Sequence, residues 1–158
     1  NLFFSVQPVC ETHKVHLIIN DSPSLANDLQ ASGIHIGQND PSYEQARKAV
    51  GKTGIVGMTC HNSVELAKIA EQRGANYVAF GSFFPTLTKK VQGLADPSTL
   101  ETWKRVSTTP SVAIGGITPG NCHPLIKSGA NFLAVISSFW EHPMGPLTAL
   151  EEFKKAMI

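Results

Sequence analysis

Short apolar segments alternate with longer amphipathic ones along most of the chain. The apolar segments are rich in β-branched or aromatic residues and are continuous rather than alternating, which is typical of parallel strands buried on both faces. They predict strands over residues 16–20, 34–37, 54–59, 77–80, 111–117 and 132–137.

The amphipathic segments between the apolar runs predict helices over residues 42–50, 63–73, 98–106 and 147–157, and residues 5–12 read as the end of a further helix. In segment 63–73, we expect Val64, Ala67, Ile69 and Ala70 to share one face. Ser63 is a suitable N-cap for this helix, and Gly74 is a suitable residue to end it.

Strands that alternate with helices in this way predict right-handed β-α-β units and an α/β fold. A closed (β/α)₈ barrel needs eight strands, whereas the pattern shows six. We expect a (β/α)₈ TIM barrel whose first one or two β/α units are missing, forming one N-terminally incomplete domain over residues 1–158. An open doubly wound sheet is the alternative.

Composition narrows the class of protein. The 158 residues are 42% hydrophobic and 16% charged, with a formal net charge of +1. This balance argues against a nucleic-acid binder, which normally shows a basic face. The apolar stretches are too short to predict a membrane span. The three cysteines are scattered, which favours a reducing, cytoplasmic location.

Polar residues close each predicted strand, and in parallel architectures ligands gather beyond these ends. Asp21 and Asp40 end neighbouring strands. Two carboxylates on one rim suit Mg²⁺, which takes one or two protein carboxylates together with phosphate oxygens. The alternative is that each aspartate caps the helix that follows it.

Three further strand ends suit anions. In many barrels the loops after the last two strands bind phosphate, and here those loops begin at Gly115-Gly116 and Ser137-Ser138. Glycine lets backbone N–H groups approach phosphate oxygens. Residues 85–96 follow the fourth strand and could close over a substrate. In this segment Thr86 and Thr88 offer hydroxyls, and Lys89 offers a charge.

The cysteines and histidines do not form a pattern typical of a zinc site or of a cysteine nucleophile. The Cys60-His61 and Cys122-His123 pairs lack the usual spacing of zinc ligands. Nothing local supplies a base that would make Cys60 a nucleophile. His35 lies inside a strand, and we expect it to be a hydrogen-bonded core histidine.

Four strings give the chain a family resemblance: LIIND at 17–21, IHIGQND at 34–40, FPTLTK at 84–89 and VAIGGI at 112–117. In order and spacing they resemble the thiamine phosphate synthase family from about residue 7 onward. That resemblance implies a (β/α)₈ barrel that joins a pyrimidine methyl diphosphate to a thiazole phosphate, releasing pyrophosphate with Mg²⁺. The partners would be small phosphorylated molecules, and the sequence leaves homo-oligomerisation open.

The resemblance also implies roles for individual residues. Asn20 would contact the pyrimidine, and Asp21 and Asp40 would hold Mg²⁺. Thr59 stands where the family usually has a serine beside the diphosphate, and Lys89 would bind the diphosphate. The thiazole phosphate would be bound by Thr86, Thr88, Gly115, Gly116, Ile136 and Ser137.

The implied mechanism is dissociative, with Lys89 and Mg²⁺ neutralising the departing pyrophosphate. The family's Gln-x-Arg-x-Lys run, which grips the diphosphate, does not occur in this sequence. Two alternatives remain open. One is a thiazole tautomerase-like isomerase, and the other is a degenerate barrel that only binds a thiamine precursor or a regulatory partner.

Overall fold

All six strands form one parallel sheet whose spatial order follows the sequence. The computed structural model describes residues 2–86 and 93–158. The strands are β1 (Ile18–Asn20), β2 (Gly33–Ile36), β3 (Ile55–His61), β4 (Tyr77–Gly81), β5 (Ser111–Ile114) and β6 (Phe132–Ala134). Each of the six predicted strands is therefore confirmed, with ends that differ by a few residues.

Helices precede and follow the strands. They are α1 (Leu2–Thr12), α2 (Pro23–Asp28), α3 (Tyr43–Val50), α4 (Val64–Arg73), α5 (Pro97–Val106), α6 (His123–Lys127), α7 (Ser137–Trp140) and α8 (Pro146–Ala156). The predicted helices correspond to α1, α3, α4, α5 and α8. Helices α2, α6 and α7 were not predicted, because at six, five and four residues they are too short for an apolar stripe.

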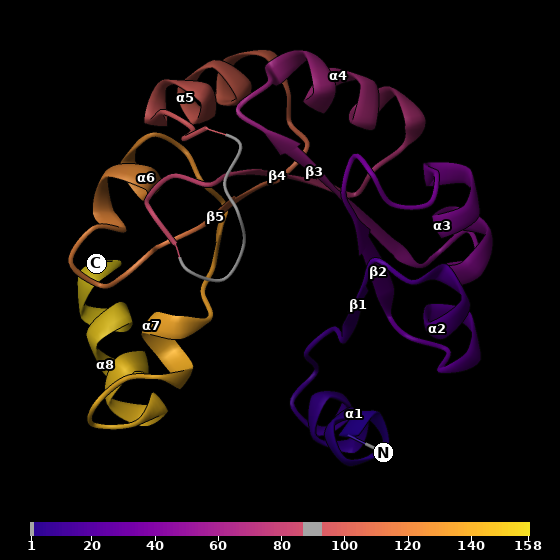
Figure 1. Cartoon of the computed structure of the whole chain (residues 1–158), viewed down its shortest axis with the longest axis horizontal. Coiled ribbons are helices and arrows are strands. Elements are labelled where there is room, and N and C mark those ends of the chain that lie inside the picture. The colour runs from indigo at the N-terminus through magenta and orange to yellow at the C-terminus, as the bar shows by residue number, and fades with distance from the viewer. Residues whose placement is uncertain (1, 87–92) are drawn as a thin grey trace.

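The sheet curves into an arc, and helices α2 to α6 cover its outer side (Figure 1). A doubly wound sheet would reverse its strand order at a switch point, so the consecutive order excludes that alternative. The predicted eight-stranded barrel is confirmed in part only. The described residues form a six-stranded half-barrel, not a closed one.

Local sequence signals set the helix ends. Ser42 and Gln45 form a reciprocal capping box at the start of α3. The Ser63 side chain accepts a hydrogen bond from the backbone N–H of Leu66 at 3.2 Å at the start of α4. Gly74 ends α4 with a left-handed φ of 94°, a conformation that glycine adopts without steric cost. The roles predicted for Ser63 and Gly74 are thus confirmed.

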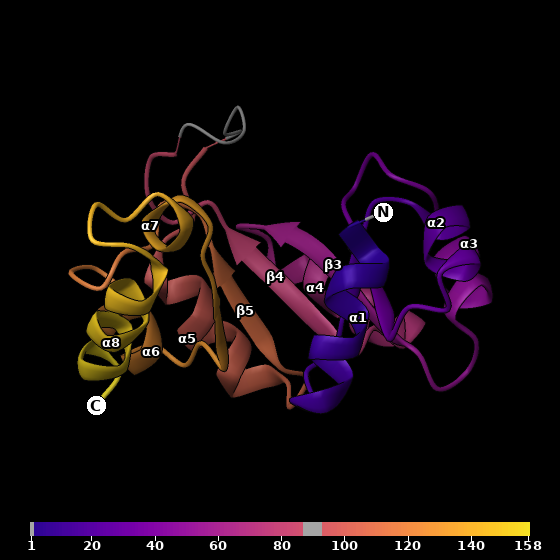
Figure 2. The same cartoon turned by 90° about the horizontal axis from the view of Figure 1, so that it is seen from below.

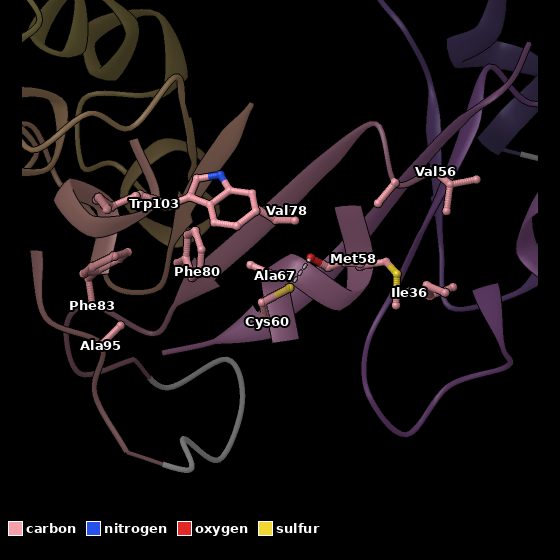
Figure 3. Packing of buried hydrophobic residues seen from close by; sticks show 14 of the residues in the cluster. Ile36, Val56, Met58, Cys60, Ala67, Val78, Phe80, Phe83, Ala95 and Trp103 are labelled. Atoms are coloured by element: carbon pink, nitrogen blue, oxygen red, sulfur yellow. Dashed lines mark hydrogen bonds between the residues drawn. The ribbon is translucent and has the colours of Figure 1, made fainter. Parts of the chain in front are cut away.

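The hydrophobic core lies between the sheet and the outer helices (Figure 3). Alternate strand residues point outward into it, among them Ile36, Val56 and Val78. Phe80 packs edge-on against Trp103 of α5, with ring centroids 5.9 Å apart. Burial of such side chains is the main force that holds the helices on the sheet.

The inner face of the half-barrel is less completely covered. Register pairs His35 with Gly57, and Gly57 with Tyr77, so these residues share that face. Phe132 of β6 also lies on it and is 61% exposed, and Ile114 is 36% exposed. The expectation that every strand is buried on both faces is therefore wrong for β5 and β6.

Polar side chains tie the helix ends to the turns that follow them. Arg47 donates hydrogen bonds to three backbone carbonyls and, at 2.8 Å, to Asn76 Oδ1. Glu71 accepts hydrogen bonds from the hydroxyls of Ser107 and Thr109. These two bonds hold the pKa of Glu71 below its usual value. The hydrogen bonds of Arg47 and of Glu71 thus connect neighbouring β/α units.

Candidate active site at the strand ends

The carboxyl ends of all six strands lie along one edge of the sheet, because every neighbouring pair is parallel. Figure 2 shows helix α7 and the segment that leaves β4 at this edge. The predicted residues Asn20, Asp21, Thr59, Thr86, Gly115, Gly116, Ile136 and Ser137 all lie at or near these ends. Thr88 and Lys89 lie outside the described residues.

The two aspartates close neighbouring strands. Asn20 is the last residue of β1, and its side-chain amide donates to Asp21 Oδ2 at 3.2 Å. The backbone N–H of Asp21 donates to the carbonyl of His35 at 2.8 Å, which holds this strand end beside β2. Asp21 has a left-handed φ of 64°, a conformation that aspartate tolerates better than most residues.

Asp40 turns back onto the end of β2. Its Oδ2 accepts a hydrogen bond of 2.6 Å from the backbone N–H of Gly37. A Cβ on residue 37 would lie 2.9 Å from that same oxygen, so glycine makes the close approach possible. The carboxylate is thereby fixed while keeping further lone pairs for a ligand.

The capping alternative for the aspartates is wrong. The N-cap of α2 is Ser22, whose hydroxyl accepts from the backbone N–H of Leu25 at 3.3 Å. The N-cap of α3 is Ser42. Asp21 and Asp40 therefore belong to the rim rather than to the helix starts.

Thr59 is held by a side chain of β2 and by one from the loop that follows β2. Its Oγ1 lies 2.8 Å from His35 Nε2, and His35 Nδ1 lies 2.9 Å from the Tyr77 hydroxyl. The Gln38 side chain donates to the carbonyl of Thr59. His35 is hydrogen-bonded as expected, but it is half-buried on the inner face and does not belong to the hydrophobic core. Sequence reasoning missed these contacts of Gln38 and Tyr77. Strand register brings Tyr77 to His35, and the loop after β2 brings Gln38 to Thr59.

The glycine pair after β5 packs against the segment that leaves β4. The backbone N–H of Phe84 donates to the carbonyl of Gly115 at 3.1 Å. A Cβ on Gly115 would lie 1.9 Å from Ser82 Oγ, and one on Gly116 would lie 2.4 Å from the Pro85 carbonyl. Glycine is therefore required at both positions for the two segments to pack. This packing brings the segment that contains Thr86 to the end of β5.

The end of β6 is joined to the same region. Ser137 begins the short helix α7, so the predicted loop there is in fact helical. The hydroxyl of Ser138 donates to the carbonyl of Ile117 at 2.6 Å. Asn121 donates to the carbonyl of Gly116 at 3.0 Å and orders the loop after β5. The two predicted phosphate-binding elements are thus held together, and in barrels such sites commonly include a short extra helix.

Cys60 and Cys122 are fully buried. Burial raises the pKa of the Cys60 thiol to about 12, so the thiolate needed for nucleophilic attack is not formed at neutral pH. The buried Cys60 thiol is therefore not available as a nucleophile. Within residues 2–86 and 93–158, no three histidine, cysteine or acidic side chains gather as a metal-binding group.

Two surface hollows lie away from the rim. One is lined by α3, the turn after it and the end of α4, and includes Arg47 and Arg73. The other is lined by α1 and by the segments that precede β1 and β2, and includes Cys10 and Ser32. Neither hollow is lined by a predicted site residue. Across the described helices, none is long and apolar enough to cross a membrane.

A family model described as thiamine monophosphate synthase matches residues 2–139. The chain belongs to the thiamine monophosphate synthase family. This membership accounts for the four strings that carried the resemblance, each of which falls at the end of a strand or just beyond it.

Individual relatives agree with the family assignment. The chain is 45% identical to the thiamine-phosphate synthase of Rhodospirillum centenum, over 96% of this chain and 73% of that protein. It is 49% identical to the thiamine-phosphate synthase of Erythrobacter litoralis, over 85% of this chain and 64% of that protein. The chain thus spans about two thirds to three quarters of these two thiamine monophosphate synthase relatives.

The half-barrel also matches a solved structure. The thiamine phosphate pyrophosphorylase of Pyrococcus furiosus superposes with a TM-score of 0.86 at 27% identity, over 99% of this chain and 74% of that one. The match extends through all six strands, so the thiamine monophosphate synthase family and the observed fold are consistent with each other.

Proposed function

We propose that this protein is a thiamine-phosphate synthase, a transferase that joins a pyrimidine methyl diphosphate to a thiazole phosphate and releases pyrophosphate. The proposal is supported by the position of Asp21, Asp40, Thr59 and the Gly115–Ser137 region along one edge of a parallel sheet, in a chain of this family. A cytoplasmic location accompanies this proposal as a prediction.

The diphosphate-binding part of the site is built around Thr59. Its hydroxyl belongs to β3, between the strands that end near the aspartates and the strands that end near the glycine pair. Asn20, beside Asp21, contacts the pyrimidine in this proposal. The glycine pair, Ile136, Ser137 and Thr86 hold the thiazole phosphate, and Thr88 and Lys89 complete the anion-binding groups.

The residues at the first two strand ends fit Mg²⁺. Asp21 and Asp40 offer carboxylate oxygens, and Asp40 is fixed by the Gly37 amide. Magnesium prefers oxygen ligands of this kind and usually keeps substrate phosphate oxygens and water in its remaining positions. Bound there, it would neutralise charge on the diphosphate.

The reaction in this proposal is a dissociative substitution. The bond between the pyrimidine methylene carbon and the diphosphate oxygen breaks, and the leaving pyrophosphate takes the electron pair. The thiazole nitrogen then donates its lone pair to the cationic carbon. Thr59 and Lys89 stabilise the negative charge that grows on the leaving group. No protein nucleophile is needed, which agrees with the buried state of Cys60.

The test is pyrophosphate release by the full-length protein, with both substrates present, and with and without Mg²⁺. Asp21→Asn should lower the metal-dependent rate by at least about 100-fold, as removal of a group that stabilises transition-state charge commonly does. Asp28→Asn is the matched control, because Asp28 is exposed at the far end of α2 and should leave the rate unchanged. No release by the wild type, or an active Asp21→Asn variant, would contradict the proposal.

A further inference from the structure

A chain of hydrogen bonds crosses three strands on the inner face of the half-barrel and ends at Thr59. The Tyr77 hydroxyl of β4 lies 2.9 Å from His35 Nδ1 of β2, and His35 Nε2 lies 2.8 Å from Thr59 Oγ1 of β3. The path therefore passes from β4 across β3 to β2 and returns to β3. Tyr77 and His35 are half-buried, and the side-chain hydrogen bonds between them continue to Thr59 near the rim.

Gly57 makes this path possible. It stands between His35 and Tyr77 in the strand register. A Cβ at residue 57 would lie 2.0 Å from Tyr77 Cζ, so the phenol ring occupies the space that any other side chain would need. The ring crosses β3 at this point and stacks on the His35 imidazole, with centroids 5.5 Å apart and planes 18° from parallel. Glycine weakens a strand interior, and here a specific contact explains its presence.

The direction of the hydrogen bonds decides what Thr59 can offer to a ligand. Burial raises the pKa of Tyr77 to about 12, so the phenol keeps its proton. When the phenol O–H donates to Nδ1, an imidazole with a single N–H carries it on Nε2 and donates it to Thr59 Oγ1. Thr59 then has its hydroxyl hydrogen left to give to an acceptor at the rim. The opposite tautomer would take that hydrogen for the imidazole.

We propose that Tyr77 and His35 are positioning residues that hold the Thr59 hydroxyl as a hydrogen-bond donor aimed at the diphosphate of the substrate. This inference rests on the proposed function and goes beyond it, because it assigns a direction to each bond in the chain. Gln38 supports the arrangement from the rim, where its amide donates to the Thr59 carbonyl and holds the backbone in place. A Thr59 hydroxyl that donates its hydrogen favours an anionic hydrogen-bond acceptor as the ligand beside it, and disfavours a ligand group that is itself a donor.

Steady-state kinetics on the full-length protein test whether Tyr77 acts on the reaction through the Thr59 hydroxyl. Tyr77→Phe keeps the ring and removes the hydroxyl, and it should lower kcat/KM for the pyrimidine diphosphate about tenfold, the effect of one poorly oriented hydrogen bond. The KM for the thiazole phosphate should not change. Thr59→Ser should retain activity, whereas Thr59→Val should lose it. Adding Tyr77→Phe to Thr59→Val should cause no further loss, because the chain acts only through that hydroxyl.

Tyr43→Phe is the matched control. It also removes a phenol hydroxyl that makes hydrogen bonds, to the Gly74 carbonyl at 2.9 Å and with Arg47 at 3.0 Å, but on the outer helix α3. It should leave both KM values unchanged. If the wild type is active and Tyr77→Phe behaves like Tyr43→Phe, or if the effects of Tyr77→Phe and Thr59→Val multiply, the positioning role is wrong.

A spectroscopic measurement tests the bond directions without any turnover. Nitrogen-15 NMR of histidine-labelled full-length protein, with the His35 signals assigned through His35→Gln, should show the hydrogen on Nε2. In Tyr77→Phe the population of the two tautomers should change. Hydrogen on Nδ1 in the wild type would overturn the inference, even if the protein releases pyrophosphate. Absence of pyrophosphate release would instead overturn the proposed function, and with it the assignment of the diphosphate as the acceptor, whereas the bond directions are tested by the NMR measurement.

Discussion

Gly57→Ala is the substitution whose consequence the structure defines most sharply. The new Cβ would lie 2.0 Å from Tyr77 Cζ and 2.4 Å from each of the two neighbouring ring carbons. Carbon atoms in favourable contact are about 3.5–4.0 Å apart. The ring must therefore move by roughly 1.5 Å, which is enough to break the 2.9 Å contact between the Tyr77 hydroxyl and His35.

The cost has two parts. Overpacking of a tight site typically costs about 1–3 kcal/mol. Loss of one intramolecular hydrogen bond adds about 1 kcal/mol. We therefore expect the free energy of unfolding to fall by about 2–4 kcal/mol, and kcat/KM to fall at least as far as in Tyr77→Phe.

Urea unfolding of the full-length protein measures the stability change. Fluorescence of Trp103, which is buried against Phe80, reports the transition. Gly120→Ala is the matched control, because a Cβ there would meet nothing closer than 3.9 Å, and it should shift stability by less than about 0.5 kcal/mol. In a Tyr77→Ala background, Gly57→Ala should cost almost nothing. An equal loss in both backgrounds would refute the steric explanation.

Three further predictions concern other parts of the molecule. Arg47→Lys should lower the free energy of unfolding in urea by about 1–3 kcal/mol, because an ammonium group cannot reproduce the fork that joins three carbonyls and an amide. Glu71→Gln should be destabilising near pH 7 and nearly neutral at low pH. The pKa of Glu71 is lower in the folded than in the unfolded protein, so its carboxylate stabilises the fold at a pH above the unfolded-state pKa. This stabilisation is lost as the pH falls through the folded-state pKa. Urea unfolding curves recorded across this pH range measure the difference between the variant and the wild type. A maleimide should label half-exposed Cys10 and leave Cys60 unlabelled until the protein is denatured, as mass spectrometry of peptides would show.

The sequence predicted the fold well where side-chain pattern and local chemistry agree. The strands at 34–37 and 77–80 were recognised because β-branched and aromatic residues cluster there, and α4 because Ser63 and Gly74 bound it. The short helix α7 was missed, since four residues carry no periodicity. The exposed inner face at Phe132 was also missed, because an apolar run reads the same whether one or both faces are covered.

The sequence was enough to predict which strand ends carry the candidate site, but not which side chains contact one another there. Parallel strands bring Asp21 and Asp40 to neighbouring positions whatever their side chains do, so the rim could be foreseen. The competing role as helix caps could be rejected only when Ser22 and Ser42 were seen to occupy those positions. The link from Tyr77 through His35 depends on strand register, which a single sequence does not specify.

The most direct test is a crystal structure of the full-length protein with Mg²⁺, thiamine phosphate and pyrophosphate bound. The account predicts a metal ion about 2.0–2.1 Å from carboxylate oxygens of Asp21 and Asp40. It also predicts a pyrophosphate oxygen within hydrogen-bonding distance of Thr59 Oγ1, and the phosphate of the product beside Gly116 and Ser137. Ligands bound at another place, such as the hollow beside Arg47, would contradict it.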